Sequence, residues 1–303
     1  LIYTMKDDQK YVPLLDDEGK LSSMFLFVSN IESKDPLQVI EGNQKVIRPR
    51  LSDAKFFFEN DKKTTLASKA AKLATVLFQK ELGTVADKTA RLVLISISIA
   101  KELKIDPTHV ARAATLSKAD LLSDMVMEFP SVQGIMGHHY ALHDGEHANV
   151  ALAIEEQYLP RFAGDRLPTS SAGYILSLAE KLDTLVGIFG IGKLPKGDKD
   201  PFALRRSAIG ILRIMVENKL ALDIHSMVKS VVSIYADRLS NAQTATQVHT
   251  FLMDRFKPLY QDQDITGDVV SAVMTQQPTT AIDFDARIRA VTAFKQMDSA
   301  VDL

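Results

Sequence analysis

Four histidines and one aspartate lie in a short stretch, and side chains of these types bind divalent metals. They are His138, His139, His143, His147 and Asp144. His139 and His143, or His143 and His147, would share one helix face at the spacing of one turn. Gly145 is expected to break the helix between the second pair, and histidines near a helix end are commonly surface or hydrogen-bonded residues. The spacing therefore leaves both a metal site and ordinary surface histidines open.

Asp183 is the carboxylate with the most demanding position. The apolar residues around it recur at helical spacing and predict one buried helix face: Ala172, Ile175, Leu176, Ala179, Leu182, Val186 and Phe189. Asp183 lies on that same face. Because a lone buried charge is strongly unfavourable, the carboxylate must be paired, hydrogen-bonded, metal-bound or protonated. Two interpretations of Asp183 remain open. It could bind a metal together with nearby imidazoles, or it could accept hydrogen bonds from backbone amides or a lysine.

The segment 187–193, GIFGIGK, has the glycine and lysine spacing of a phosphate-binding P-loop. Leu194 stands where that motif needs a Ser or Thr for magnesium, and the segment follows a predicted helix instead of a strand. We therefore predict a helix C-cap and a turn at this position.

A basic stretch follows immediately. It contains Lys193, Lys196, Lys199, Arg205, Arg206 and Arg213, diluted by Asp198 and Asp200. A phosphate at the predicted helix start could also meet free backbone amides. Charge runs are usually solvated faces, so a role in binding a phosphate backbone needs independent support.

Composition limits the class of protein. The 303 residues suit about two domains of ordinary size, and 46% hydrophobic with 24% charged residues is typical of a soluble globular protein. With a net charge of -2, any nucleic-acid contact must come from a local patch. No cysteine is present and no apolar run is long enough to span a membrane, so we expect a cytoplasmic protein without a membrane partner. The chain begins with Leu1 in an apparent strand, and we expect a piece of something longer.

The elements that must position these residues are mostly helical. Short apolar stretches at 11–15 and 24–29 flank the turn sequence DDEGK and predict a β hairpin. From Gly42 onward the apolar period is that of helices. The predicted interruptions are Pro49, 60–63, Gly83, Asp106-Pro107, Pro130, Pro160, Pro168 and the loop 190–201.

The stretch 84–103 is representative of these helices. Its apolar stripe is Val85, Thr89, Leu92, Val93, Ser96, Ile99, Ala100 and Leu103. The residues predicted to lie off the stripe are Asp87, Lys88, Arg91, Lys101 and Glu102. Asp106 and Asp200, each followed by proline, predict two further helix starts with proline in the first turn.

Long collinear strings show that the chain resembles the β subunit of the bacterial two-subunit glycyl-tRNA synthetase. The strings are VIRPRLSDAKFFFENDKK (46–63), FQKELGTVADKTAR (78–91), LSKADLLSDMVMEFPSVQGIMG (116–137), YALHDGE (140–146), EEQYLPRFAGDRLP (155–168), KLDTLVGIFGIGKLPKGDKDPFALRR (181–206) and PTTAIDFDARIRAVTAF (278–294). The last one ends before the point where the anticodon-binding domain of the family would begin. The resemblance therefore implies a central portion of that subunit, without most of its N-terminal domain and its C-terminal tRNA-binding domain.

A second, more remote resemblance is to the HD phosphohydrolases, whose metal site needs an upstream His, a His-Asp dyad and a final Asp in a K-x-D helix. Lys181-Leu182-Asp183 is similar to the final motif, whereas Ser117 and Lys118 stand in place of the dyad and Gln79 lies where the first histidine is expected. A lysine ammonium repels a divalent cation. The resemblance thus implies a degenerate HD-like site without a metal, in which Asp183 is expected to pair with Lys118. We assign to this site Ser117, Lys118, His139, His143, Asp144 and Asp183.

The resulting fold prediction is mainly α: an HD-like helical domain plus a further helical body, with a short N-terminal β hairpin. Residues 1–45 are predicted to end a preceding β-containing domain or linker, 46–222 to form the HD-like domain, and 223–303 to form a helical body leading to the anticodon-binding domain.

Two functions from different classes compete. In the preferred one, the chain is a non-catalytic part of glycine–tRNA ligase that binds tRNA and acts as a scaffold, while ATP and Mg are used on the α subunit and this part needs no cofactor. Its partners are then the α subunit and tRNA(Gly), in an assembly of two α and two β subunits. The expected tRNA-binding residues are Lys193, Lys196, Lys199, Arg205 and Arg206. The alternative is a metal-dependent HD-type phosphohydrolase that uses His138, His139, His143 and Asp183.

Overall fold

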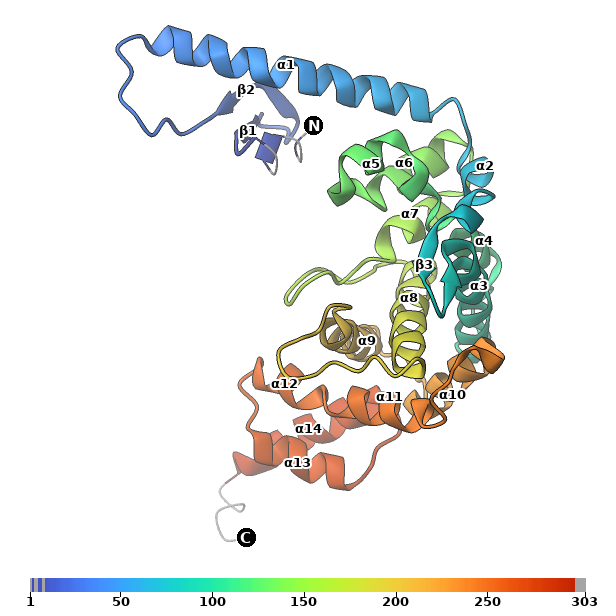
Figure 1. The fold of residues 1–303 in the computed structure, drawn as a ribbon. Coiled ribbons are helices and arrows are strands. Elements are labelled where there is room, and N and C mark those ends of the chain that lie inside the picture. The colour runs from blue at the N-terminus through green and yellow to red at the C-terminus, as the bar shows by residue number, and fades with distance from the viewer. Residues whose placement is uncertain (1, 3–4, 7–8, 298–303) are drawn as a thin grey trace.

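A computed structural model describes residues 2, 5–6 and 9–297 of the chain. The described part is mainly α-helical, as predicted, and it is elongated (Figure 1). Helix α1 (Pro36–Asp61) lies at one end, and α13 (Gly267–Thr275) and α14 (Ala281–Lys295) lie at the other. The remaining helices stack between these ends.

The predicted N-terminal hairpin is confirmed. Strands β1 (Val12–Leu15) and β2 (Leu21–Leu26) pair antiparallel, and the Asp16 carboxylate accepts hydrogen bonds from the backbone of Glu18 and Lys20 in the turn. One face of the hairpin packs on α1 and forms a small hydrophobic cluster separate from the main core. This cluster contains Met5, Tyr11 and Ile47, with Phe25, Phe27 and Leu51 against them.

Helix α1 runs through Pro49, where the sequence predicted an interruption, so that prediction is wrong. Proline has no N–H, and the carbonyl of Lys45 therefore lacks its helical partner. Lys45 is exposed, so water can bond to this carbonyl in place of an amide. The start of α1 is capped by the Asp35 carboxylate, which accepts from the backbone amides of Leu37 and Gln38.

A second small hairpin was not predicted from the sequence. Strands β3 (Leu77–Gln79) and β4 (Gly83–Thr84) pair antiparallel directly before α3 (Val85–Glu102). Strands this short contain too few residues to show an alternating pattern. Both sheets in the described residues are antiparallel and two-stranded, so no parallel sheet interrupts the helical body there.

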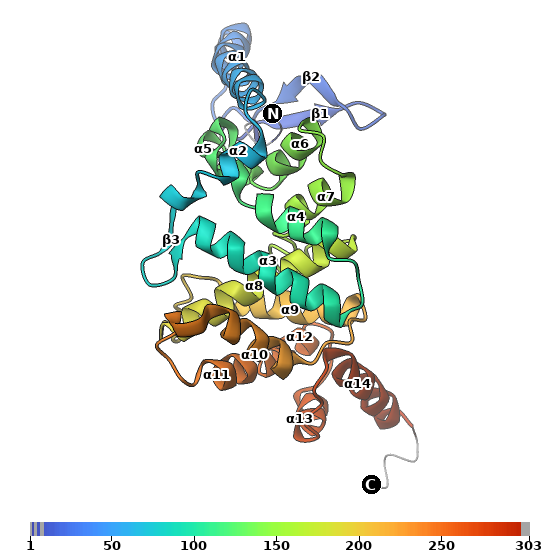
Figure 2. The same ribbon diagram turned by 90° about the vertical axis from the view of Figure 1, so that its right-hand side faces the viewer.

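The centre of the molecule is a layered group of helices around α8 (Ser171–Gly190), which contacts helices on several sides (Figure 2). Its neighbours are α3, α4 (Thr108–Leu116), α7 (Ala148–Glu156), α9 (Leu204–Glu217), α10 (Ile224–Tyr235) and α11 (Thr244–Met253). Shorter helices complete the body: α2 (Leu66–Ala70), α5 (Asp124–Glu128), α6 (Ile135–His143) and α12 (Phe256–Gln261). The predicted helices over 84–103 and 170–189 are confirmed as α3 and α8.

Two helix starts differ from the prediction in detail. Asp106 bonds the amide of Thr108, where α4 begins, so Pro107 lies just before the helix. Asp200 accepts from the amides of Leu204 and Arg205, both at 2.9 Å, and α9 begins only at Leu204. The aspartates thus accept from amides of the first turns, but the N-cap residues are Pro107 and Ala203, so the predicted N-caps and the prolines in the first turn are wrong.

The main hydrophobic core continues from Ala54 to Ile288. The domain boundaries predicted after residues 45 and 222 stay predictions. Within the described residues, no helix combines the length and the apolar character that a membrane span requires.

Candidate functional site

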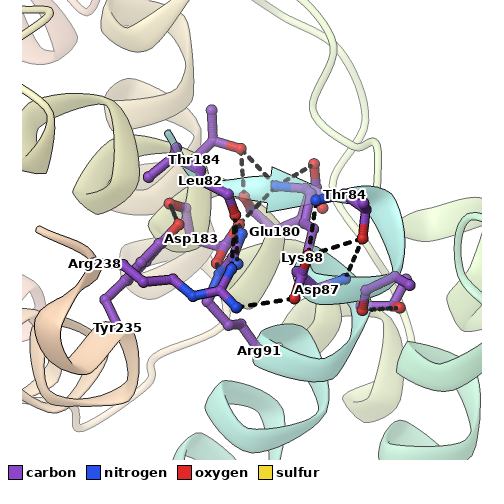
Figure 3. A network of polar contacts seen from close by, with 12 residues as sticks. Leu82, Thr84, Asp87, Lys88, Arg91, Glu180, Asp183, Thr184, Tyr235 and Arg238 are labelled. Carbon is purple, nitrogen blue, oxygen red and sulfur yellow. Dashed lines mark hydrogen bonds and ion pairs between the residues drawn. The ribbon is translucent and has the colours of Figure 1, made fainter. Parts of the chain in front are cut away.

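The Asp183 carboxylate lies at the centre of a buried ion-pair cluster between α8 and α3 (Figure 3). Its exposed fraction is 0%. Arg91 donates from Nε to Oδ1 at 2.6 Å, and Lys88 donates from Nζ to Oδ2 at 2.9 Å. The sequence predicted that a buried Asp183 needs a partner, and two cations of α3 are its partners.

Lys88 and Arg91 were predicted to lie off the buried stripe of their helix, which is wrong, since they are 3% and 5% exposed. Their long side chains lie along aromatic rings while the charged ends reach Asp183. The Lys88 ammonium is 4.5 Å from the centroid of Phe78, and the Arg91 guanidinium is 4.4 Å from that of Tyr235. Cation–π contact and the aliphatic stems make burial of these cations possible.

Glu180, one helical turn before Asp183, forms the second half of the cluster. Its carboxylate lies 3.3 Å from the ammonium of Lys88 and 3.3 Å from that of Lys118. The expected pair between Lys118 and Asp183 is therefore wrong. Lys118 comes after α4, and α8 presents Glu180 toward it while Asp183 faces α3.

The charges of the cluster shift one another's pKa values. Burial alone would raise the pKa of Glu180, but the adjacent Lys118 and Lys88 outweigh burial and lower it to about 2. Burial lowers the pKa of Lys118, and it lowers that of Lys181 to about 7. Lys181 donates to the carbonyl of Leu159 at 2.6 Å and has no carboxylate at bonding distance in the described part of the chain. The cluster is therefore built around fixed ion pairs.

The donor set of this site does not fit a divalent metal. Both oxygens of Asp183 already accept hydrogen bonds from cations, and Lys118 is a further positive charge beside Glu180. A metal ion would have to displace these cations and would be repelled by them. Across residues 9–297, no three His, Asp or Glu side chains lie close enough together to hold a metal ion.

Ser117 and Gln79, which stand where the HD motif has metal-binding residues, have separate structural roles. Ser117 is fully buried and donates to the carbonyl of Ala114 at 2.9 Å. Gln79, in β3, accepts from the amides of Glu81 and Leu82. Neither side chain contacts Asp183. The assignment of these residues to one degenerate site stays a prediction.

The histidines lie around the end of α6 rather than around Asp183. As predicted, the helix stops at His143, followed by Gly145 with φ +81°. The other candidate metal ligands do not share a site, because each contacts a different part of the protein. His138 bonds Glu155 at 2.9 Å, His139 lines an apolar cavity beside α1, Asp144 accepts from the amide of Leu66, and His147 accepts from the amide of Asn149 while stacking on His109.

The segment GIFGIGK is the C-terminus of α8 and the turn after it, as predicted. Gly192 adopts φ +74° and donates to Phe189, and the amide of Lys193 donates to Ile188 at 3.0 Å, which together form a Schellman motif. Gly187 and Gly190 have a different role. A Cβ at Gly187 would overlap the Tyr235 hydroxyl, and one at Gly190 would overlap the side chain of Leu239.

The predicted tRNA-binding residues lie together in the loop after α8 and in the first turn of α9. We call Lys193, Lys196, Lys199, Arg205 and Arg206 the basic loop. Lys196 and Lys199 pair through their backbones, at 3.1 and 3.0 Å, around a two-residue turn. Residues paired in this way point to the same face. Both lysines are exposed, and neither forms an ion pair with any described residue.

The other members of the basic loop are anchored to the body. Lys193 lies 3.5 Å from Glu81, and Arg206 donates to the carbonyl of Arg161 at 3.1 Å. The Arg205 guanidinium donates to the carbonyl of Gly197, in the turn between the two paired lysines. The anchored residues therefore fix the position of the free ones.

Sequence reasoning missed Lys88, Arg91 and Glu180, although one signal for them was present. Lys88 and Arg91 are three residues apart on one apolar helix, and Glu180 and Asp183 are three residues apart on another. Two such pairs of opposite sign fit each other when the helices pack side by side. Such complementary pairs are a usable sequence signal for a buried cluster.

Comparison with known proteins places the chain in a class. Residues 1–275 match the family model described as glycyl-tRNA synthetase beta subunit. The chain belongs to this family.

Individual relatives agree with this assignment. Over 99% of the chain, it is 59% identical to the glycine–tRNA ligase beta subunit of Alteromonas mediterranea. Over all of the chain, it is 58% identical to that of Pseudoalteromonas atlantica and 52% identical to that of Photorhabdus laumondii. The chain spans 43% to 44% of the length of these relatives.

Proposed function

We propose that the chain is a tRNA-binding and scaffolding part of a glycine–tRNA ligase β subunit. Family membership and the names of the relatives support this proposal. Glycine activation with ATP and Mg is assigned to a separate α subunit, so this part needs no cofactor of its own. The partners are the α subunit and tRNA(Gly), in a cytoplasmic assembly of two α and two β subunits.

The observation that carries the tRNA-binding role is the exposed lysine pair of the basic loop. Lys196 and Lys199 are directly opposite each other across a short backbone pairing. Like charges in this arrangement repel each other, and a phosphate between them would remove the repulsion. Lysine contacts to phosphates orient a nucleic acid without reading its sequence. Base identity is then decided elsewhere in the subunit.

The test is the double substitution Lys196→Glu with Lys199→Glu in the full two-subunit enzyme. Binding of tRNA(Gly) should weaken, and the slope of log affinity against log salt should fall by roughly 0.7 to 0.9 for each lost phosphate contact. Formation of glycyl-adenylate should be unchanged, because that chemistry is assigned to the α subunit.

The matched control is Lys101→Glu with Lys229→Glu. These exposed lysines lie on α3 and α10, and their reversal changes the net charge by the same amount. The control should keep the affinity and the salt slope of the parent enzyme. If both double variants bind tRNA(Gly) equally well, the lysines of the basic loop are an ordinary solvated face.

The alternative of a metal-dependent phosphohydrolase receives no support from the geometry. Its metal site would need Asp183, and this carboxylate is held by Lys88 and Arg91. Stoichiometric metal in the purified protein together with phosphodiester turnover that depends on Asp183 would restore the alternative.

A further inference from the structure

A cavity of about 390 Å³ borders the segment that carries the basic loop. It is lined by Leu194 and Pro195, which lie between Lys193 and Lys196 in the sequence, by residues of α11, and by Arg205 at the start of α9. The cavity therefore adjoins the segment that carries Lys196 and Lys199.

The inner walls of the cavity are apolar and aromatic. Phe189 at the end of α8 is buried and lies 5.0 Å from the half-buried ring of Phe251, between centroids. The Arg255 guanidinium lies 5.0 Å from the centroid of Phe251. Its Nε is buried and has no hydrogen-bond partner in the described part of the chain. A guanidinium plane held against an aromatic ring can stack a flat aromatic ligand on its other face.

The rim of the cavity offers both hydrogen-bond donors and acceptors. The exposed carboxylate of Asp254 is an acceptor, and Thr250 contributes a hydroxyl. Gln247 receives a hydrogen bond from Asn241 on its Oε1, at 2.9 Å, which leaves its amide nitrogen as a donor. A flat ring with donors and acceptors along its edge would be complementary to this rim.

We propose that the cavity binds one unstacked nucleobase of an RNA strand whose phosphates lie on Lys196 and Lys199. This inference rests on the proposed function and adds a base-binding site to it. Arg205 couples the two parts, because it lines the cavity and also donates to the carbonyl of Gly197 between the lysines. Recognition of RNA commonly combines a phosphate track with stacking of unpaired bases on aromatic and guanidinium planes.

The cavity and the lysine pair predict different experimental signatures. Loss of a phosphate contact changes the salt slope, whereas loss of a stacked base lowers the affinity at every salt concentration. Phe251→Leu keeps an apolar side chain against Phe189 but removes the ring. Arg255→Lys keeps the charge but removes the planar guanidinium. Neither substitution alters the net charge.

The experiment measures binding of tRNA(Gly) to the full two-subunit enzyme over a series of salt concentrations. Phe251→Leu and Arg255→Lys should each weaken binding by about tenfold with the salt slope unchanged. Phe294→Leu, at an exposed phenylalanine of α14, is the matched control and should bind like the parent enzyme.

Parent-like affinity in both cavity variants, with the thermal unfolding transition retained, would overturn the base site. If Phe251→Leu does not fold, the affinity of Arg255→Lys for tRNA(Gly) alone tests the base site. The lysine variants report on the proposed function independently. A lowered salt slope there, with no effect of the cavity variants, would leave the phosphate contact valid and refute only the base site.

Discussion

The buried cluster and the basic loop are both rich in cations and both adjoin α8, but they differ in how their charges are compensated. In the cluster, Lys88, Arg91 and Lys118 each lie within 3.3 Å of a carboxylate of α8. In the basic loop, Lys196 and Lys199 are exposed, without an acidic partner in the part of the chain that the structure describes. Burial thus separates charges that hold helices together from charges that remain free for an anion.

The largest effect is expected from Asp183→Ala, which removes the carboxylate shared by Lys88 and Arg91. Arg91 would remain buried without a counter-charge, and Lys88 would keep only Glu180, which it shares with Lys118. Breaking a buried pair in this way costs about 3 to 5 kcal/mol. Denaturant unfolding measures the loss. Asp262→Ala, at an exposed aspartate, is the control and should change stability little. A loss below about 1 kcal/mol for Asp183→Ala would show that the cluster is not structural.

An intermediate effect, dependent on pH, is expected from Lys181. Its pKa is about 7 in the folded protein because of burial, against an ordinary value of 10.5. Between these two pH values the unfolded chain binds the proton and the folded protein does not. The free energy of unfolding should therefore rise with pH in this window, by up to about 1.4 kcal/mol per pH unit.

Lys181→Met removes this titration and leaves the rest of the cluster in place. We compare the free energy of unfolding of the variant with that of the parent. The difference should favour the variant most at pH 7 and below, and it should shift toward the parent as the pH rises to 10.5. Unfolding curves at several pH values measure the difference. A difference that is independent of pH would mean that Lys181 keeps its proton in the folded protein.

The smallest effect on stability is expected in the basic loop. Lys196→Glu with Lys199→Glu changes two exposed side chains without ion-pair partners among the described residues. Its unfolding free energy should stay within about 0.5 kcal/mol of the parent value. The same denaturant measurement checks it. A loss comparable to that of Asp183→Ala would contradict the contrast between the two regions.

Hydrophobic periodicity was sufficient to predict most of the fold. It predicted α3 and α8, because each has a regular apolar face, whereas the turn sequence DDEGK between two short apolar stretches predicted the N-terminal hairpin. Periodicity did not predict the strands β3 and β4, which are too short, or the continuity of α1 through Pro49, where the carbonyl without a helical partner belongs to the exposed Lys45.

The candidate site was predictable only in part. The position of Asp183 on an apolar face showed that it needs a partner, but periodicity classifies Lys88 and Arg91 as polar and therefore as exposed. Their burial depends on contacts with Phe78 and Tyr235, which come from other elements. The clustering of the basic loop was visible in the sequence. The backbone pairing that aligns Lys196 with Lys199 was not.

The glycines of GIFGIGK have a consequence for motif searches. Gly187 leaves room for the Tyr235 hydroxyl, which donates to the carbonyl of Asp183, and Gly190 leaves room for Leu239. Glycine disfavours a helix by about 1 kcal/mol relative to alanine, yet alanine would collide at both positions. A search for glycine spacing alone would therefore report a nucleotide-binding signature here as a false positive. The spacing instead combines Gly187, where Tyr235 touches the backbone of α8, with Gly192, whose positive φ ends the helix.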